Sequence, residues 1–200
     1  MSDSALLVMD VQNVIVERYA DTAYLDRLRT AVGAARAADL PVIHVVVGFR
    51  PGRAEIHPRN KMFGALAHRP AVPGEEQANA IHAAVAPLPA EPVVVKRRVS
   101  GFSGSDLDML LRARGIGHLV LAGIATGGVV LSTVRQAADL DYRLTVLSDA
   151  CTDSDPEVHR VLTEKVFPQQ ADVVRVEEWV AGTAGRTPPV SPGPPRPEPR

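Results

Sequence analysis

Two charged residues stand at the ends of apolar segments, where proton-transfer chemistry is possible. Asp10 follows ALLVM at residues 5–9, and Lys96 follows PVVV at residues 92–95. A carboxyl and an amino group can act together as general acid and base. A structural interpretation stays open for both residues. Asp10 can accept hydrogen bonds from backbone amides, and a lysine at the end of a strand is most often a surface charge.

A glycine-rich turn is the third candidate feature. Residues 123–130 read GIATGGVV and join an apolar strand to an expected helix. Free N–H groups and the helix dipole at such a position favour an anion or a developing oxyanion. Gly127 and Gly128 would let the backbone approach a ligand closely. Entry into the helix explains the turn equally well, so the turn by itself decides nothing.

The elements that would position these residues alternate between strands and helices. Apolar runs predict strands at residues 5–9, 41–47, 92–95, 118–122, 143–147 and 171–176. Periodicity and capping predict helices at residues 23–39, 75–84, 106–114, 128–140 and 156–165. Continuous apolar strands indicate burial on both faces, as in a mostly parallel six-stranded α/β sheet between helix layers. Ligands bind beyond the carboxyl ends of such strands, which is where the candidate residues fall.

Residues 48–73 do not fit this alternation. The segment contains four prolines, three glycines and five lysine or arginine residues. Long loops of this kind in compact domains are often lids or binding loops. Its cations, with Arg50 among them, are expected either to clamp a substrate carboxylate or to form a solvated surface.

Together these segments resemble the isochorismatase-like superfamily of cysteine hydrolases. The motifs that carry the resemblance are LLVMDVQN, VVVKRRVSGFSGSDLD and GIATGGVVLSTVRQAADLDYRLTVLSDAC. The resemblance covers residues 5–176 and implies a three-layer α/β/α Rossmann-like sandwich over residues 1–180. By this resemblance, Asp10 matches the acid/base aspartate and Lys96 the active-site lysine. Ile124–Ala125 matches a cis peptide that shapes the oxyanion hole.

One position departs from the family's pattern. When Thr126 is aligned with the family's threonine, Val129 occupies the position of the nucleophilic cysteine. Valine has no nucleophilic atom, so hydrolysis through a thioester is closed. The single cysteine, Cys151, is expected to be a small buried residue after the fifth strand. The superfamily also contains enzymes without this cysteine, in which an aspartic acid protonates the carbon of an enol ether and water captures the oxocarbenium ion.

The resemblance therefore implies a hydrolase that acts on a small anionic molecule through Asp10 and Lys96, with enol-ether hydrolysis as the nearest precedent. The residues expected to contact the substrate are Gln12, Arg50, Phe102, Ile124, Ala125, Thr126 and Val129. One alternative is a catalytically inactive small-molecule-binding or scaffold protein on the same fold. Another is an amidase that uses Cys151 or a water activated by Asp10.

Composition bears on the other classes of protein. The formal net charge of -1 gives no basic excess to attract nucleic acid. One cysteine excludes an internal disulfide framework, and His57 lacks the acidic and histidine neighbours of a metal site, so we expect no metal and no cofactor. No apolar run approaches the roughly 20 residues of a membrane span, and no signal-peptide pattern begins the sequence. We expect a cytoplasmic protein without membrane partners, and the resemblance implies a homodimer or homotetramer.

Residues 181–200 are expected to lie outside the domain. The stretch RTPPVSPGPPRPEPR at residues 186–200 is dominated by proline and has almost no apolar residues able to form a core. Such a segment cannot bury enough surface to offset its conformational entropy, which predicts a disordered tail. A ligand for a proline-binding domain is the alternative interpretation.

Overall fold

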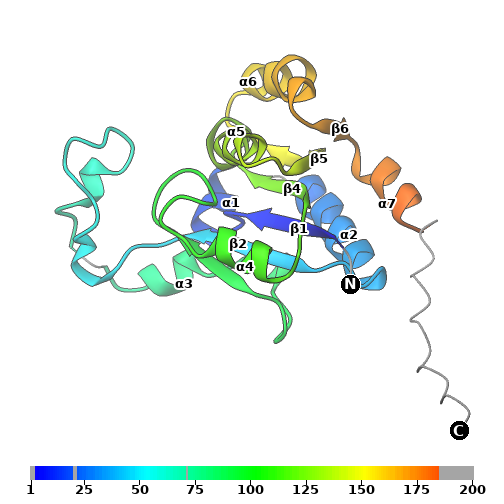
Figure 1. Cartoon of the computed structure of the whole chain (residues 1–200). Helices are drawn as coiled ribbons and strands as arrows, with labels where there is room; N and C mark the ends of the chain where they lie inside the picture. The colour runs from blue at the N-terminus through cyan, green and yellow to red at the C-terminus, as the bar shows by residue number, and fades with distance from the viewer. Residues whose placement is uncertain (1–2, 20–21, 71, 185–200) are drawn as a thin grey trace, which may run out of the picture.

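The computed structural model describes residues 3–19, 22–70 and 72–184. Its six strands form one sheet in the order β3-β2-β1-β4-β5-β6, and every neighbouring pair is parallel (Figure 1). The strands are β1 (Ser4–Met9), β2 (Val42–Val47), β3 (Val93–Lys96), β4 (His118–Ile124), β5 (Arg143–Thr152) and β6 (Asp172–Val174). The expected α/β class and parallel six-stranded sheet are confirmed.

The strand order sets the position of the candidate site. β1 pairs with β2 on one side and with β4 on the other, so the winding of the chain reverses between β1 and β4. Such a switch point leaves a crevice beyond the carboxyl ends of the two strands, and ligands bind there in sheets of this order. Met9, the last residue of β1, lies beside Val45 and Gly123. Asp10 and the turn after β4 therefore lie at the switch point.

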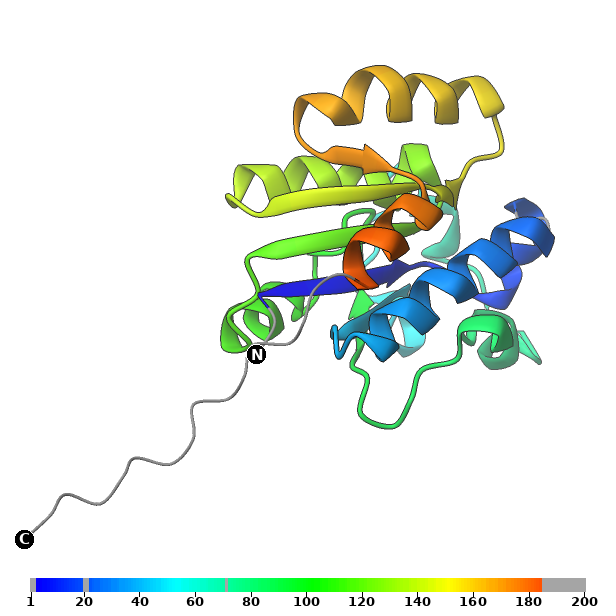
Figure 2. The ribbon, with the colours of Figure 1, turned by 90° about the vertical axis from the view of Figure 1, so that its right-hand side faces the viewer.

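Helices cover both faces of the sheet. The described α-helices are α1 (Asn13–Tyr19), α2 (Thr22–Ala37), α3 (Glu75–Asn79), α4 (Leu107–Ala113), α5 (Leu131–Asp139), α6 (Pro156–Val161) and α7 (Val176–Ala184). One apolar cluster joins the sheet to α4 and α5, and a second joins it to α1, α2 and α7. Figure 2 shows α2 and α7, which contact each other, together on one side of the strands. The molecule is thus a three-layer sandwich.

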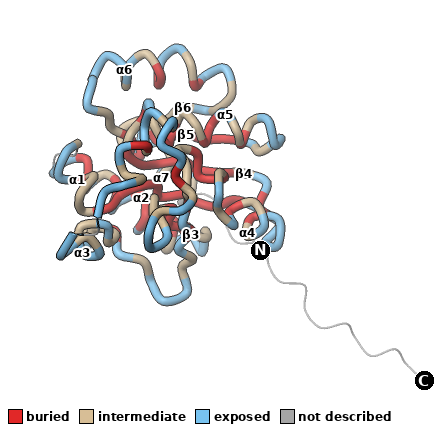
Figure 3. The backbone as a smooth tube through the Cα atoms, turned by 90° about the vertical axis from the view of Figure 1, so that its left-hand side faces the viewer, coloured by how far each residue is buried: buried red, intermediate tan, exposed pale blue. Residues whose placement is uncertain are grey.

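The central strand explains why both layers are needed. Ala5, Leu7 and Met9 of β1 pack into the first cluster, while Leu6 and Val8 pack into the second. All five side chains are buried, and Figure 3 shows the strands as the buried centre of the chain. A continuous apolar strand of this kind contributes on both faces, with each large side chain worth roughly 1.5–3 kcal/mol.

Several elements differ from the sequence-based expectation. The helices α1 and α7 were not predicted, and α7 runs past the expected domain boundary at residue 180. The helix expected from residue 128 begins regularly only at Leu131, because residues 126–130 form an irregular turn. The helix expected over residues 75–84 ends at Asn79. Strand β5 continues to Thr152, so Cys151 lies within it and not after it.

The segment at residues 48–70 forms an excursion away from the sheet. In Figure 1 it extends away from the rest of the chain (cyan), and it contains two short 3-10 turns, Pro51–Arg53 and Gly64–Leu66. Arg53 fixes it internally by donating to the carbonyls of Leu66 and Arg69 and by pairing with Glu75. The side chain of Arg53 therefore stabilises the segment itself.

Two further expectations concern membrane spans and the proline-rich stretch. Within the part of the chain that the structure describes, no helix has both the length and the apolar character that a membrane span requires. The proline-rich stretch at residues 186–200 lies outside the described residues.

Candidate active site

The side chains of Asp10 and Lys96 are in contact, although Asp10 follows β1 and Lys96 ends β3, two strands away in the sheet. Asp10 follows β1 with a left-handed backbone, φ 56°, a conformation that aspartate tolerates better than most residues. Its N–H donates to the carbonyl of Val45 at 2.7 Å. Lys96 ends β3, and its Nζ lies 2.9 Å from Asp10 Oδ2 and 3.0 Å from the carbonyl oxygen of Arg98. The two candidates predicted separately from the sequence thus form one ion pair.

Burial controls the electrostatics of this pair. The exposed fraction of the side chain is 9% for Asp10 and 2% for Lys96. Burial raises the pKa of Asp10 to about 6, against the opposing attraction and hydrogen bond of Lys96. Asp10 Oδ1 is also buried and has no hydrogen-bond partner among the described residues. A carboxyl group in this state can donate a proton near neutral pH and can take one back.

A turn with irregular backbone follows β4, the strand that lies beside β1. The Ile124–Ala125 peptide is cis, as the family resemblance implied. Residues 126–130 then form an irregular helical turn. Within this turn Gly128 departs from helical geometry, with φ -103° and ψ -106°. Val129 is buried and packs in the apolar cluster on the α4–α5 face. Its side chain supplies apolar volume where the resemblance expects a nucleophile.

The close approach of β4 to β1 requires a glycine and gives a test of the site's packing. A Cβ added to Gly123, whose φ is 152°, would lie 2.2 Å from the carbonyl oxygen of Met9. We expect Gly123→Ala to lower the free energy of unfolding by roughly 2–3 kcal/mol, as overpacking does. Denaturant titration measures the change. Gly117→Ala is the matched control, because its Cβ would meet nothing within 4 Å. Equal stability of the two variants would contradict the packing argument.

Gln12 ties the Asp10 loop to its neighbours. Its Oε1 accepts from the N–H of Val47 at 3.0 Å. Its Nε2 donates to the carbonyls of Val47 at 3.1 Å and Asn79 at 2.7 Å. Gln12 is buried, so these bonds lock the end of β2 and the end of α3 beside Asp10. Gln12, which was predicted to contact the substrate, therefore holds these two segments together in the structure.

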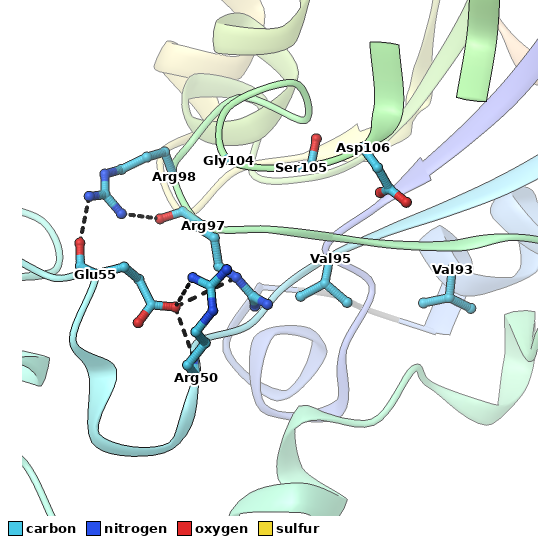
Figure 4. A pocket seen from close by; sticks show the side chains of 9 residues that line it. All are labelled: Arg50, Glu55, Val93, Val95, Arg97, Arg98, Gly104, Ser105 and Asp106. Atoms are coloured by element: carbon cyan, nitrogen blue, oxygen red, sulfur yellow. Dashed lines mark hydrogen bonds and ion pairs between the residues drawn. The ribbon is translucent and has the colours of Figure 1, made fainter. Parts of the chain in front are cut away.

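Arg50 and Phe102 lie in different surroundings. Arg50 lines an open cavity of about 750 Å³ at the edge strand β3, whose lining includes neither Asp10 nor Val129 (Figure 4). There it pairs with Glu55, with 3.5 Å between Arg50 Nη1 and Glu55 Oε1. Phe102 is buried in the core, where its ring centre lies 5.9 Å from that of Tyr142. Among the described residues, no group of three or more acidic, histidine or cysteine side chains is arranged to hold a metal ion.

Comparison with known families now adds to this geometry. The model of the isochorismatase domain matches residues 4–178. The chain belongs to the isochorismatase family. Two similar proteins are named ureidoacrylate amidohydrolase RutB. That of Stutzerimonas stutzeri is 36% identical over 90% of this chain and 79% of its own length. That of Enterobacter sp. is 34% identical over 94% of this chain and 90% of its own length.

Solved structures agree with this membership of the isochorismatase family. An isochorismatase family protein from Burkholderia thailandensis superposes with a TM-score of 0.80 at 29% identity, covering 92% of this chain and 97% of the other. One from Desulfovibrio vulgaris gives 0.79 at 26% identity, covering 92% of this chain and all of the other. The three-layer architecture is therefore the family's own.

The only cysteine of this family member does not resemble a reactive thiol. Cys151 is 4% exposed and lies within β5, beside Gly123 of β4. Burial raises the pKa of its thiol to about 12, so almost no thiolate exists near neutral pH. This matches the expectation of a small buried residue.

Two further residues contact the turn and were not predicted from the sequence. Asp153 Oδ2 accepts from the N–H of Gly127 at 2.7 Å. His159 Nδ1 lies 2.8 Å from the hydroxyl oxygen of Thr126. Asp153 directly follows β5 in the structure, but the sequence-based prediction ended this strand at residue 147, so the position of Asp153 at the carboxyl edge gave no signal. The sequence likewise offers no signal for His159, which lies on the exposed helix α6.

Proposed function

We propose that this member of the isochorismatase family is a hydrolase that acts on a small anionic molecule without a protein nucleophile. The observation that carries the proposal is the buried Asp10–Lys96 pair. One oxygen of Asp10 is held by Lys96, and the other is buried without a partner among the described residues. The pKa of about 6 keeps the protonated acid accessible near neutral pH.

Enol-ether hydrolysis is the reaction for which this pair suffices. Asp10 donates its proton to the terminal carbon of the C=C bond, and the electron pair of that bond forms the new C–H bond. The ether oxygen stabilises the resulting oxocarbenium ion. Water adds to that ion and returns a proton to the Asp10 carboxylate, and the adduct collapses to a carbonyl compound and an alcohol. Lys96 stabilises Asp10 while it is ionised.

Two observations argue against a nucleophilic route. Val129, at the position that the resemblance assigns to the nucleophile, offers only carbon atoms. Cys151 is buried within a strand, with a pKa of about 12. Because relatives are named ureidoacrylate amidohydrolase, amide hydrolysis by a water molecule activated by Asp10 belongs in the tests.

A catalytically inactive binding protein is the second candidate. The observation that favours it is the low exposure of Asp10, Lys96 and Val129, each below one tenth. Such a protein would bind the same small anions and release no product. The pair Asp10–Lys96 would then persist as a buried charge pair, which is often no better for stability than an apolar replacement.

The remaining assignments complete the proposal. The turn residues Ile124, Ala125 and Thr126 would form the side of the site that faces the anionic group of the substrate, and Arg50 and Phe102 would contact the substrate only after a rearrangement of their present contacts. We further propose a homodimer or homotetramer in the cytoplasm, with no cofactor, which the family resemblance supports.

A substrate panel tests the proposal. It contains isochorismate and other vinyl ethers, amides including nicotinamide and ureidoacrylate, and small carboxylates. Wild-type protein is expected to turn over a vinyl ether, and Asp10→Asn is expected to lower kcat at least roughly 100-fold while binding is retained. Product release and thermal shift are recorded side by side.

The controls separate the candidates. Cys151→Ala should keep full activity and should not change sensitivity to thiol reagents. An Asp10→Asn variant with wild-type turnover would overturn acid catalysis. Stabilisation by a ligand without product from any member of the panel would favour the binding protein.

A further inference from the structure

The turn that carries Val129 is anchored by side chains from outside the Asp10–Lys96 pair. Gly127 donates its N–H to Asp153, and Thr126 shares a hydrogen bond with His159. Asp153 follows β5, and His159 lies in α6, so both anchors come from the segment beyond the neighbouring strand. The proposed chemistry assigns no proton transfer to this segment.

Burial makes the Thr126–His159 contact costly to lose. Thr126 is completely buried, and His159 is half-buried. A buried hydroxyl that loses its partner retains the full cost of its desolvation. The contact therefore helps to hold the turn in place.

The helix α6 is packed tightly against the same turn. A Cβ added to Gly127 would lie 3.1 Å from Val158 Cγ1 and 3.2 Å from Asp153 Oδ2. A side chain at residue 127 would thus lie closer to its neighbours than most side chains do, so little space separates the turn from α6. A movement of α6 would therefore be transmitted to the turn.

The backbone of the turn is not held by the regular hydrogen bonds of an α-helix. Its N–H groups at Gly128 and Val130 both donate to the carbonyl of Ala125, at 3.0 and 3.3 Å. Gly128 has non-helical backbone angles, and a regular α-helix begins only at Leu131. External anchors consequently have a larger share in placing the backbone at residues 126–129 than they would have in a regular helix.

We propose that Asp153 and His159 are positioning residues that fix the Thr126–Val130 turn against the Asp10–Lys96 pair. The inference rests on the proposed function for its catalytic consequence. The geometry of the turn decides how its backbone amides hold the anionic group of the substrate and so orient the substrate toward Asp10. A small displacement of such groups lowers the rate of the chemical step more than it weakens binding of the substrate.

The test uses five variants of the full chain, four single and one double. His159→Leu and Thr126→Val each remove the same hydrogen bond, and their combination should cost no more than either alone. His159→Asn keeps a polar group near the position of Nδ1 and should rescue most of the loss. Arg160→Ala is the matched control, because Arg160 lies next to His159 in α6 and its ion pairs among the described residues are with Glu157 and Glu164.

Two readouts are measured. For a substrate that the wild type converts, His159→Leu is expected to lower kcat roughly 10-fold to 100-fold with little change in KM. Independently of turnover, hydrogen–deuterium exchange should rise in a peptide spanning residues 123–131, with peptides from β1 and α2 unchanged. His159→Asn and Arg160→Ala should show wild-type exchange.

The outcomes separate this inference from the proposed function. Wild-type exchange at residues 123–131 in His159→Leu overturns the positioning role, as does faster exchange spread equally over the whole chain. If the wild-type protein converts no member of the panel, the proposed function fails and the exchange measurement alone decides the inference. If turnover falls and the single and double variants are additive, the shared bond is not the cause, and the inference fails.

Discussion

Replacing Val129 with cysteine is expected to create an amidohydrolase activity that thiol reagents abolish. The substitution puts a thiol at the position that the family resemblance assigns to the nucleophile. The protein also has the other groups that such a thiol would use: the Asp10–Lys96 pair, in which Asp10 would accept the proton, and the turn that follows β4. We expect at least a roughly 100-fold gain over the parent protein on the best amide of the panel.

Two controls define this gain. Val129→Ala removes the valine side chain without adding a nucleophile, so any activity it shares with Val129→Cys arises from space alone. Val129→Cys combined with Asp10→Asn should lose the gain, because the thiol then lacks its base. Activity of Val129→Cys that survives alkylation would show that the new thiol does not act. An inactive but folded Val129→Cys protein would mean that more than the nucleophile has been lost from the site.

The positions of the charged pair follow directly from the sequence. Asp10 and Lys96 each end a continuous apolar run, and parallel strands bring their carboxyl ends to one edge. Their contact also depends on the strand order, since β3 lies two positions from β1. That order cannot be read from the apolar runs themselves. The sequence predicted a parallel six-stranded sheet, and the structure adds the order of its strands.

The elements that were not predicted have specific physical causes. The helix α1 reads NVIVERY, and its β-branched run resembles a strand more than a helix. In β5, polar residues such as Ser148 and Asp149 hide the continuation to Thr152. This part of the strand is held by hydrogen bonds to residues distant in the sequence. For example, the Asp149 carboxylate accepts from the N–H of Val176 at 2.8 Å. Tertiary contacts override local preference in both cases.

The helix expected from residue 128 shows a different cause. The sequence VVLSTVRQAAD has regular helical periodicity, but the preceding residues are bound to Asp153 and His159 across the fold. Contacts between segments about 30 residues apart leave no periodic signal. The hydrogen bonds of Gln12 were not predicted for the same reason, since its partners Val47 and Asn79 are distant in the sequence.

Lys96→Met is expected to give the largest change in stability and to make stability strongly dependent on pH. It leaves the buried Asp10 carboxylate without its partner, and breaking a buried pair costs about 3–5 kcal/mol. Lys96 lowers the pKa of Asp10, so its removal moves that pKa above the present value of about 6. Because the folded state then binds a proton that the unfolded state releases, the free energy of unfolding falls as pH rises through this range.

The matched comparison is the double variant Lys96→Met with Asp10→Asn. It lacks the same lysine and the same bond to Arg98, but residue 10 can no longer ionise. Other titrating groups, such as the buried His44, are common to both proteins and cancel in the difference. Denaturant unfolding between pH 5 and pH 8 should therefore show the two proteins close in stability at the acid end and the single variant increasingly weaker toward pH 8. A constant difference across this range would mean that burial of the Asp10 charge does not govern the pair, and the assignment of Asp10 as the acid would lose its electrostatic basis.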